Sequence, residues 1–183
     1  MHKFLIICIL IFSMFFLSSC SIGGSRIEML NKDNDEIEAE NVLTHVIDAI
    51  KYQDKDALKT VFSKQAVGDA DDFDDGVDGL FKFIQGKINS FEKTSGPTVF
   101  ESNDHGRKKK EVSSYYYVKT DSQKYFFLLK NYPVDTDHPD NVGLYLLLVV
   151  KAEDKNDIYD GDKKILYDGD KKISHAGIYI PIK

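Results

Sequence analysis

The chain has 183 residues, 42% of them hydrophobic, which is enough for one domain with an ordinary apolar core. Its formal net charge is −6 at pH 7. An acidic surface repels nucleic acid and is not drawn to anionic lipid, so composition excludes a nucleic-acid-binding role and a membrane contact made by surface charge.

The N-terminal segment has the layout of a signal peptide. Lys3 precedes an almost unbroken apolar run, residues 4–17, and small residues close the run. The run is shorter than the ~20 apolar residues that a membrane-spanning helix needs, and no basic cluster follows it. We therefore expect residues 1–19 to be removed. The alternative is an ordinary secreted protein with a chance cysteine at position 20.

The stretch Leu17-Ser18-Ser19-Cys20 resembles the lipobox of bacterial lipoproteins. The resemblance implies cleavage after Ser19, a diacylglyceryl group on Cys20 and a lipid-anchored protein on the extracytoplasmic face of the cell membrane. Two acyl chains hold a protein stably on a bilayer, whereas one gives marginal binding. Cys8 is removed with the signal peptide, so the mature chain has no internal disulfide and depends on its apolar core.

The next residues, 20–35, are rich in Gly, Ser, Asn and charge, which predicts a lipidated, flexible tether. The alternative there is a short helix near residues 26–30. Residues 36–183 then form a single domain. Its first predicted helix, about 36–52, has an apolar stripe at helical spacing. The stripe consists of Leu43, Val46, Ile47 and Ile50, with Ile37 and Ala39 extending it backwards.

Two further helices are predicted before residue 86. Asp54 or Asp56 caps a short helix that carries Leu58, Val61 and Phe62 on one face. A longer helix closes at Gly86 and has an acidic start that suits the positive end of its dipole. Its apolar positions are Phe73, Val77, Leu80, Phe81 and Ile84.

After Gly86 the pattern changes to strands. The strongest runs are 112–118, 125–129 and 144–150, and weaker ones lie at 88–91, 98–100 and 178–180. The run 144–150 lacks polar alternation, so we expect it to be a central strand covered on both faces. Residues 132–141, with two prolines, predict a long surface loop.

Residues 158–173 are a tandem duplication of an eight-residue unit that contains Tyr-Asp-Gly-Asp-Lys-Lys. Two units are too few for a solenoid, which needs at least three. Because each Asp-Gly favours a tight turn, we interpret the duplication as a lengthened loop or hairpin.

Helices followed by a mostly antiparallel sheet indicate the α+β class. The residues 48–63 resemble the opening of nuclear-transport-factor-two-like, or cystatin-like, cone domains. Together with the motifs at 81–86, 143–145 and 177–181, the chain also resembles an uncharacterised family of lipoproteins from Gram-positive bacteria, the DUF5104 type. The resemblance implies N-terminal helices packed on a curved sheet, with a pocket at the wide end of the cone. Proteins of this fold include enzymes and binding modules, so the fold alone does not choose the function.

The acidic clusters are weak metal candidates. A calcium loop starting at Asp71 would place Phe73 and Lys82 at ligand positions, and each Asp-Gly-Asp of the duplication is followed by two lysines. Solvated helix starts and turns are the favoured interpretation. We predict no metal, no cofactor and no catalytic residue.

Two residues remain as pocket candidates, His45 and Tyr116. His45 lies beside the apolar stripe of the first helix, one turn before Asp48, and is the histidine best placed for acid/base work; a surface histidine is the alternative. In Tyr115-Tyr116-Tyr117, strand alternation sends Tyr116 to the opposite face from its neighbours, and core packing is the alternative to a pocket role.

The function predicted from these observations is a membrane-anchored module that binds an unknown protein or small ligand without catalysis. One alternative is an immunity or inhibitor lipoprotein against a toxin or hydrolase that attacks the envelope. Another is a small-molecule enzyme that uses the cone pocket. For the predicted binding module, we expect His45→Ala to leave function largely intact.

Overall fold

The computed structural model describes residues 21–159, 167–168, 171–172 and 176–180. Contacts divide the chain into two units, residues 1–37 and 38–183, each compact by itself. Among the described residues, no helix is long and apolar enough to cross a membrane. The predicted signal peptide and Cys20 lie outside the described part.

Helix α2 runs from Ser21 to Tyr52. The predicted stripe Leu43, Val46, Ile47 and Ile50 is buried, and so is Ala39. The prediction for Ile37 is wrong, because its side chain is 60% exposed. It lies six residues before Leu43, which at about 100° per residue is about 120° away around the helix axis.

The start of α2 also differs from the predicted flexible tether at 20–35, since residues 21–35 are helical. Helix propagation is cheap once a nucleus exists, and the buried stripe between Leu43 and Ile50 supplies one. The segment also contains no proline and several good helix formers such as Glu28, Met29 and Leu30. The composition of residues 20–35 therefore does not indicate how far the helix extends.

Three short helices follow α2. Asp54 accepts a hydrogen bond from the Ala57 N–H at 2.8 Å and caps α3 (Lys55–Val61), as predicted. Ser63 caps α4 (Lys64–Asp69), which was not predicted because it is short and buries only Ala66. Asp72 caps α5 (Phe73–Phe83), the predicted helix with the acidic start.

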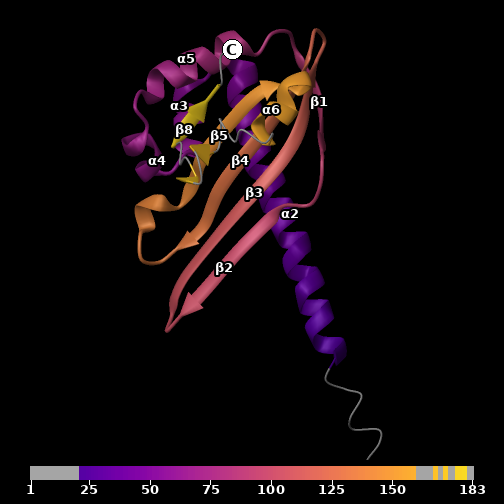
Figure 1. Ribbon diagram of the computed structural model, residues 1–183, viewed down its shortest axis with the longest axis vertical. Helices are drawn as coiled ribbons and strands as arrows, with labels where there is room; N and C mark the ends of the chain where they lie inside the picture. Colours follow the sequence, from indigo (N-terminus) through magenta and orange to yellow (C-terminus); the bar gives the residue numbers. More distant parts are fainter. Residues whose placement is uncertain (1–20, 160–166, 169–170, 173–175, 181–183) are drawn as a thin grey trace, which may run out of the picture. The chain divides into compact units, whose positions relative to one another are not determined.

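A six-stranded sheet follows the helices, in the order β1-β3-β4-β5-β8, with β2 also paired to β3 (Figure 1). Every pair is antiparallel except β5 with β8. The run 144–150 lies in β5, between β4 and β8, as predicted. The strands are β1 (Ile88–Lys93), β2 (Thr98–Asp104), β3 (Arg107–Thr120), β4 (Lys124–Asp135), β5 (Gly143–Lys151) and β8 (Gly177–Tyr179).

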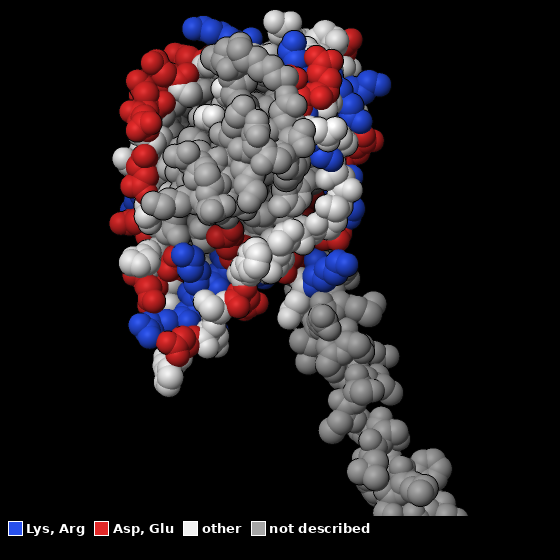
Figure 2. All heavy atoms as spheres, in the orientation of Figure 1, with Lys and Arg blue, Asp and Glu red and all other residues white. Residues whose placement is uncertain are grey.

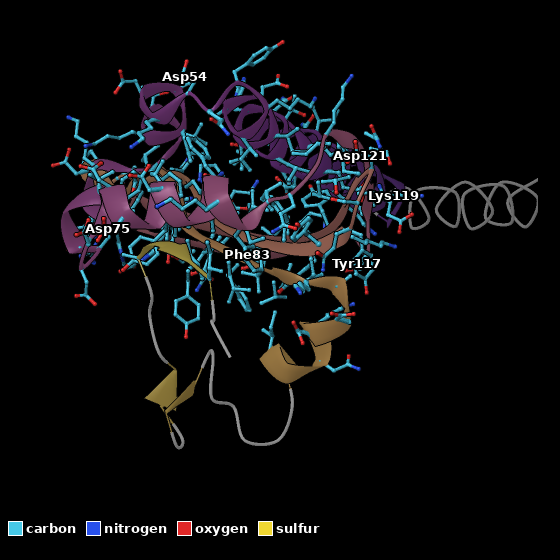
Figure 3. The ribbon with its side chains drawn as sticks, turned by 90° about the horizontal axis from the view of Figure 1, so that it is seen from above. Asp54, Asp75, Phe83, Tyr117, Lys119 and Asp121 are labelled. Atoms are coloured by element: carbon cyan, nitrogen blue, oxygen red, sulfur yellow. The ribbon has the colours of Figure 1, made fainter. Side chains whose placement is uncertain are left out.

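The sheet carries an apolar cluster on each face. Successive residues of β4 point to opposite faces of the sheet. Tyr125, Phe127 and Leu129 pack with the helices on one face. Phe126 and Leu128 pack with Ile158 on the other face. Figure 3 shows α2 and α3 on one side of the sheet and α6 (Lys155–Tyr159) on the other. The α+β class is confirmed, and the apolar stripe of the first helix shares one core with the sheet that contains β5, as predicted.

The loop predicted at 132–141 is shorter than expected, because β4 continues to Asp135. Pairing of β4 with β5 ends at Tyr132, whereas Val134 and Asp135 still pair with β3. Pro133 therefore needs no N–H on the β5 side, which is how a proline is tolerated in a strand. The remaining loop contains η1 (Pro139–Asn141).

The duplicated segment 158–173 is described only in part. A short turn of helix, η2 (Ala152–Asp154), leads from β5 into α6, where Ile158 is buried. In the second unit, β6 (Tyr167–Asp168) pairs antiparallel with β7 (Lys171–Lys172). This pairing agrees with the predicted loop or hairpin, and residues 160–166, 169–170 and 173 of the duplication lie outside the described part.

Candidate functional site

Two hollows meet at the end of α2. The α2–α3 hollow, about 430 Å³, is lined by residues of these helices that include His45, Asp48, Tyr52 and Asp54. The α2–α5 hollow, about 610 Å³, lies where α2 and α5 end and β1 begins. Its walls include Ile50, Ile84 and Ile88, which are buried in the core, and Tyr52 lines both hollows.

Tyr52 is held outward by the way α2 ends. Gln53 has a φ of 50°. The Gln53 N–H donates to the Ile50 carbonyl at 3.2 Å, and the Asp54 N–H donates to the Ala49 carbonyl at 2.9 Å. This pair of bonds is the Schellman closure of a helix, usually made with glycine at the left-handed position. The chain then turns at once into α3, which leaves the Tyr52 side chain 81% exposed.

His45 is exposed on α2 and forms part of the wall of the α2–α3 hollow. Its imidazole makes no hydrogen bond or ion pair within the described part of the chain. The two carboxylates of this hollow have other partners: Asp48 lies 3.4 Å from the Lys51 ammonium, and Asp54 caps α3. An acid/base histidine needs a group that orients it, and neither carboxylate does so here.

Tyr116 lies in the core, not beside His45. Its side chain is 3% exposed and packs edge-on against Phe91, with ring centroids 6.1 Å apart. Tyr115 and Tyr117 pack on the opposite face of the sheet, so the predicted alternation is confirmed. The two pocket candidates of the sequence therefore do not share a hollow.

A network of charged and phenolic groups joins β3 to β4 and was missed from the sequence. Lys130 lies 3.2 Å from Glu111, and both side chains are at least four-fifths buried. The Tyr132 hydroxyl donates to Glu111 at 2.9 Å, and burial and that carboxylate raise the pKa of Tyr132. Lys109 lies over the Tyr132 ring, 5.0 Å from its centroid. These groups satisfy one another, which indicates a structural role.

Asp135 closes the network at the end of β4. Its carboxylate accepts hydrogen bonds from the Asn141 side chain at 3.0 Å and the His138 backbone N–H at 3.0 Å. Burial opposes its ionisation, but these bonds and the nearby Lys109 ammonium outweigh burial and lower the pKa of Asp135. The charged carboxylate therefore holds the loop from 136 to 142.

We expect Asp135→Asn to destabilise the fold by about 1.5–3 kcal/mol at neutral pH, because an amide cannot accept both bonds. A lowered pKa contributes stability above the unfolded value near 3.8, and that contribution is lost as pH falls through the folded value. In urea denaturation, the difference in free energy of unfolding between the variant and the wild type should decrease below that pH. The exposed Asp137, changed to Asn, is the control. An equal effect in both variants would contradict this role for Asp135.

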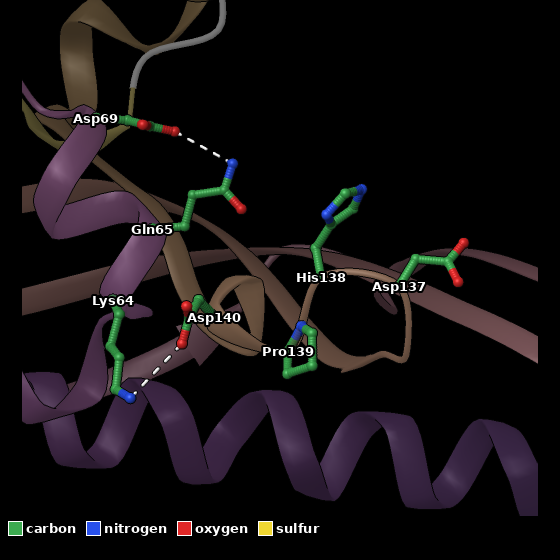
Figure 4. Close-up of a pocket in the computed structure, with 7 residues that line it drawn as sticks. All are labelled: Lys64, Gln65, Asp69, Asp137, His138, Pro139 and Asp140. Atoms are coloured by element: carbon green, nitrogen blue, oxygen red, sulfur yellow. Dashed lines mark hydrogen bonds and ion pairs between the residues drawn. The ribbon is translucent and has the colours of Figure 1, made fainter.

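A third hollow, about 530 Å³, lies between α4 and the loop after β4 (Figure 4). It is polar and its side chains are exposed; Lys64 lies 3.5 Å from Asp140, and Gln65 donates to Asp69 at 3.3 Å. Figure 2 shows acidic side chains along the edge formed by α4 and α5. Within the residues that the structure describes, no group of three or more His, Cys, Asp or Glu could hold a metal ion.

The comparison with protein families decides the membership of the chain. The model of the Domain of unknown function (DUF5104) matches residues 45–152, more than half of the chain. The chain belongs to the DUF5104 family. The match begins at His45 and ends before the duplicated segment, so in this DUF5104 chain the end of α2 at Tyr52, the two hollows beside it and the Glu111 network lie within the family region. No curated protein matches it.

Proposed function

We propose that this DUF5104 protein is a lipid-anchored envelope protein whose domain binds a polypeptide partner at Tyr52 without catalysis. The observation that carries the proposal is the 81% exposure of Tyr52 between two hollows. Tyrosine is enriched among the residues that dominate binding energy at protein interfaces.

The position of Tyr52 along α2 also supports a partner other than the membrane. Glu38 is the first residue of the second unit, and Tyr52 follows it by fourteen helical residues. At 1.5 Å per residue the two lie about 21 Å apart, at opposite ends of this part of the helix. The proposed anchor at Cys20 reaches the unit through Glu38. Tyr52 is therefore at the end of the helix away from the point of attachment.

The finer fold that we propose is the nuclear-transport-factor-two-like cone. Support comes from the motifs quoted above and from helices that pack on one face of an open, mostly antiparallel sheet. Tyr116 and Tyr125 fill space between the sheet and the helices, where a cone domain with a ligand would keep a pocket. Because these side chains fill the interior, a binding site on the surface at Tyr52 is favoured over a catalytic site inside the cone.

The second candidate is an enzyme, favoured by the presence of His45, Asp48 and Tyr52 around one hollow. We rank it lower because no described residue orients the His45 imidazole. The variant His45→Ala separates the two. Loss of function in a folded His45→Ala protein that still captures its partner would support the enzyme and overturn the binding module.

The binding proposal is tested in cells with the full-length protein. After in-cell crosslinking and affinity purification, Tyr52→Ala should reduce the captured partner about tenfold or more, the loss expected for an interface anchor. The matched control is Phe100→Ala on β2, an aromatic that is 66% exposed and lies outside both hollows. Equal capture by both variants would contradict the site. Capture of an envelope-attacking toxin or hydrolase would identify the immunity alternative.

A further inference from the structure

The two hollows beside Tyr52 carry opposite charges. The acidic residues Asp48 and Asp54 line the α2–α3 hollow, to which the described part of the chain contributes no Lys or Arg. The basic residues Lys51 and Lys87 line the α2–α5 hollow, and none of the other described residues around it is Asp or Glu. Tyr52 thus stands between a hollow with negative side chains and a hollow with positive ones.

The charged side chains of both hollows are exposed to a partner, although Asp48 pairs with Lys51 and Asp54 caps α3. Lys51 and Asp48 lie 3.4 Å apart with 41% and 51% of their side chains exposed, and exposed pairs of this kind hold each other weakly. Lys87 makes no ion pair with the described residues. Asp121, in the turn between β3 and β4, is an acidic residue close to Lys87, and its carboxylate accepts the Lys87 backbone N–H at 3.0 Å.

Both hollows have apolar atoms in their walls, but the larger apolar side chains line the α2–α5 hollow. Ile50, Ile84 and Ile88 contribute to the walls of the α2–α5 hollow, and Phe81 is half-buried beside them. In the α2–α3 hollow the apolar atoms come from Ala49, Ala57 and Val61, which are smaller. An apolar side chain of a ligand would therefore bury more surface in the α2–α5 hollow.

Resting on the proposed function, we propose that the ligand is an extended polypeptide segment of defined charge order. A basic side chain faces Asp48 and Asp54, an apolar side chain enters the α2–α5 hollow, and an acidic side chain faces Lys51 and Lys87. Charge complementarity selects this occupant, because a segment of one sign meets repulsion in one of the two hollows.

The test uses the full-length lipidated protein in detergent micelles and three fluorescein-labelled peptides that differ only in charge. They are Lys-Ala-Leu-Ala-Glu, Glu-Ala-Leu-Ala-Glu and Lys-Ala-Leu-Ala-Lys, each capped at both ends. By fluorescence polarisation the mixed-charge peptide should bind about twofold to fivefold tighter than either single-sign peptide. Raising the salt concentration should reduce this preference.

The double variant Lys51→Glu/Lys87→Glu should transfer the preference to the all-basic peptide. The control Lys108→Glu/Lys119→Glu changes two exposed lysines of β3 by the same charge and should keep the wild-type order. Thermal denaturation of both variants checks that they are folded. Failure of all three peptides to bind, equal binding of the three, or an unchanged order in the double variant overturns the charge order.

The proposed function fails separately, when Tyr52→Ala leaves in-cell capture intact. A second copy of the chain is the competing occupant. Dimerisation in sedimentation experiments that Tyr52→Ala abolishes would establish it and overturn the peptide proposal.

Discussion

Cys20→Ala should remove the protein from the membrane fraction or leave it as uncleaved precursor. The proposed anchor is the diacylglyceryl group on this cysteine, and two acyl chains supply the stable membrane binding that one chain cannot. The net charge of −6 provides no electrostatic attraction to anionic lipid that would replace the chains. Cell fractionation followed by mass spectrometry of the N-terminus measures both outcomes.

Cys8→Ala is the matched control, because Cys8 lies inside the predicted signal peptide and is lost on cleavage. This variant should give a mature protein of wild-type mass in the membrane fraction. A cleaved Cys20→Ala protein that stays in the membrane fraction would show that something other than the lipid anchors it.

Gly143→Ala should destabilise the domain by about 2–6 kcal/mol, from backbone strain and overpacking together. Gly143 has a φ of +125°, and an added Cβ would lie 2.9 Å from the Ser63 nitrogen and 3.2 Å from the Ser63 Cα. Both atoms belong to the backbone. At this point the link between α3 and α4 joins the sheet, because the Ser63 N–H donates to the Leu144 carbonyl at 2.9 Å.

Urea denaturation of Gly143→Ala and Gly106→Ala separates the two causes. Gly106 also has a positive φ, +87°, but an added Cβ there meets nothing within 4 Å. Gly106→Ala should therefore introduce backbone strain without a steric clash and lower the free energy of unfolding by about 1 kcal/mol. Equal losses in the two variants would contradict the close approach of Gly143 to Ser63.

The sequence by itself determined the elements whose signal is local. Helical spacing predicted the buried stripe from Leu43 to Ile50, and apolar continuity predicted β5 as an inner strand. The alternation of Tyr115, Tyr116 and Tyr117 between faces follows from strand geometry, which is the same wherever a strand lies. Cap residues such as Asp54 act within a few residues, so the start of α3 was also predictable.

Only the tertiary structure decided what depends on contacts between distant segments. Glu111 and Tyr132 come together through the pairing register of β3 and β4. The sequence of either strand alone does not predict that register. The same holds for the hollows at Tyr52, since Ile50 and Ile88 become neighbours only when α2 and β1 pack together. The extension of β4 past Pro133 required knowing where β5 ends. His45 and Tyr116 were predicted from their places in a helix and a strand, but the fold separates them because one lies on the outer side of α2 and the other faces the core.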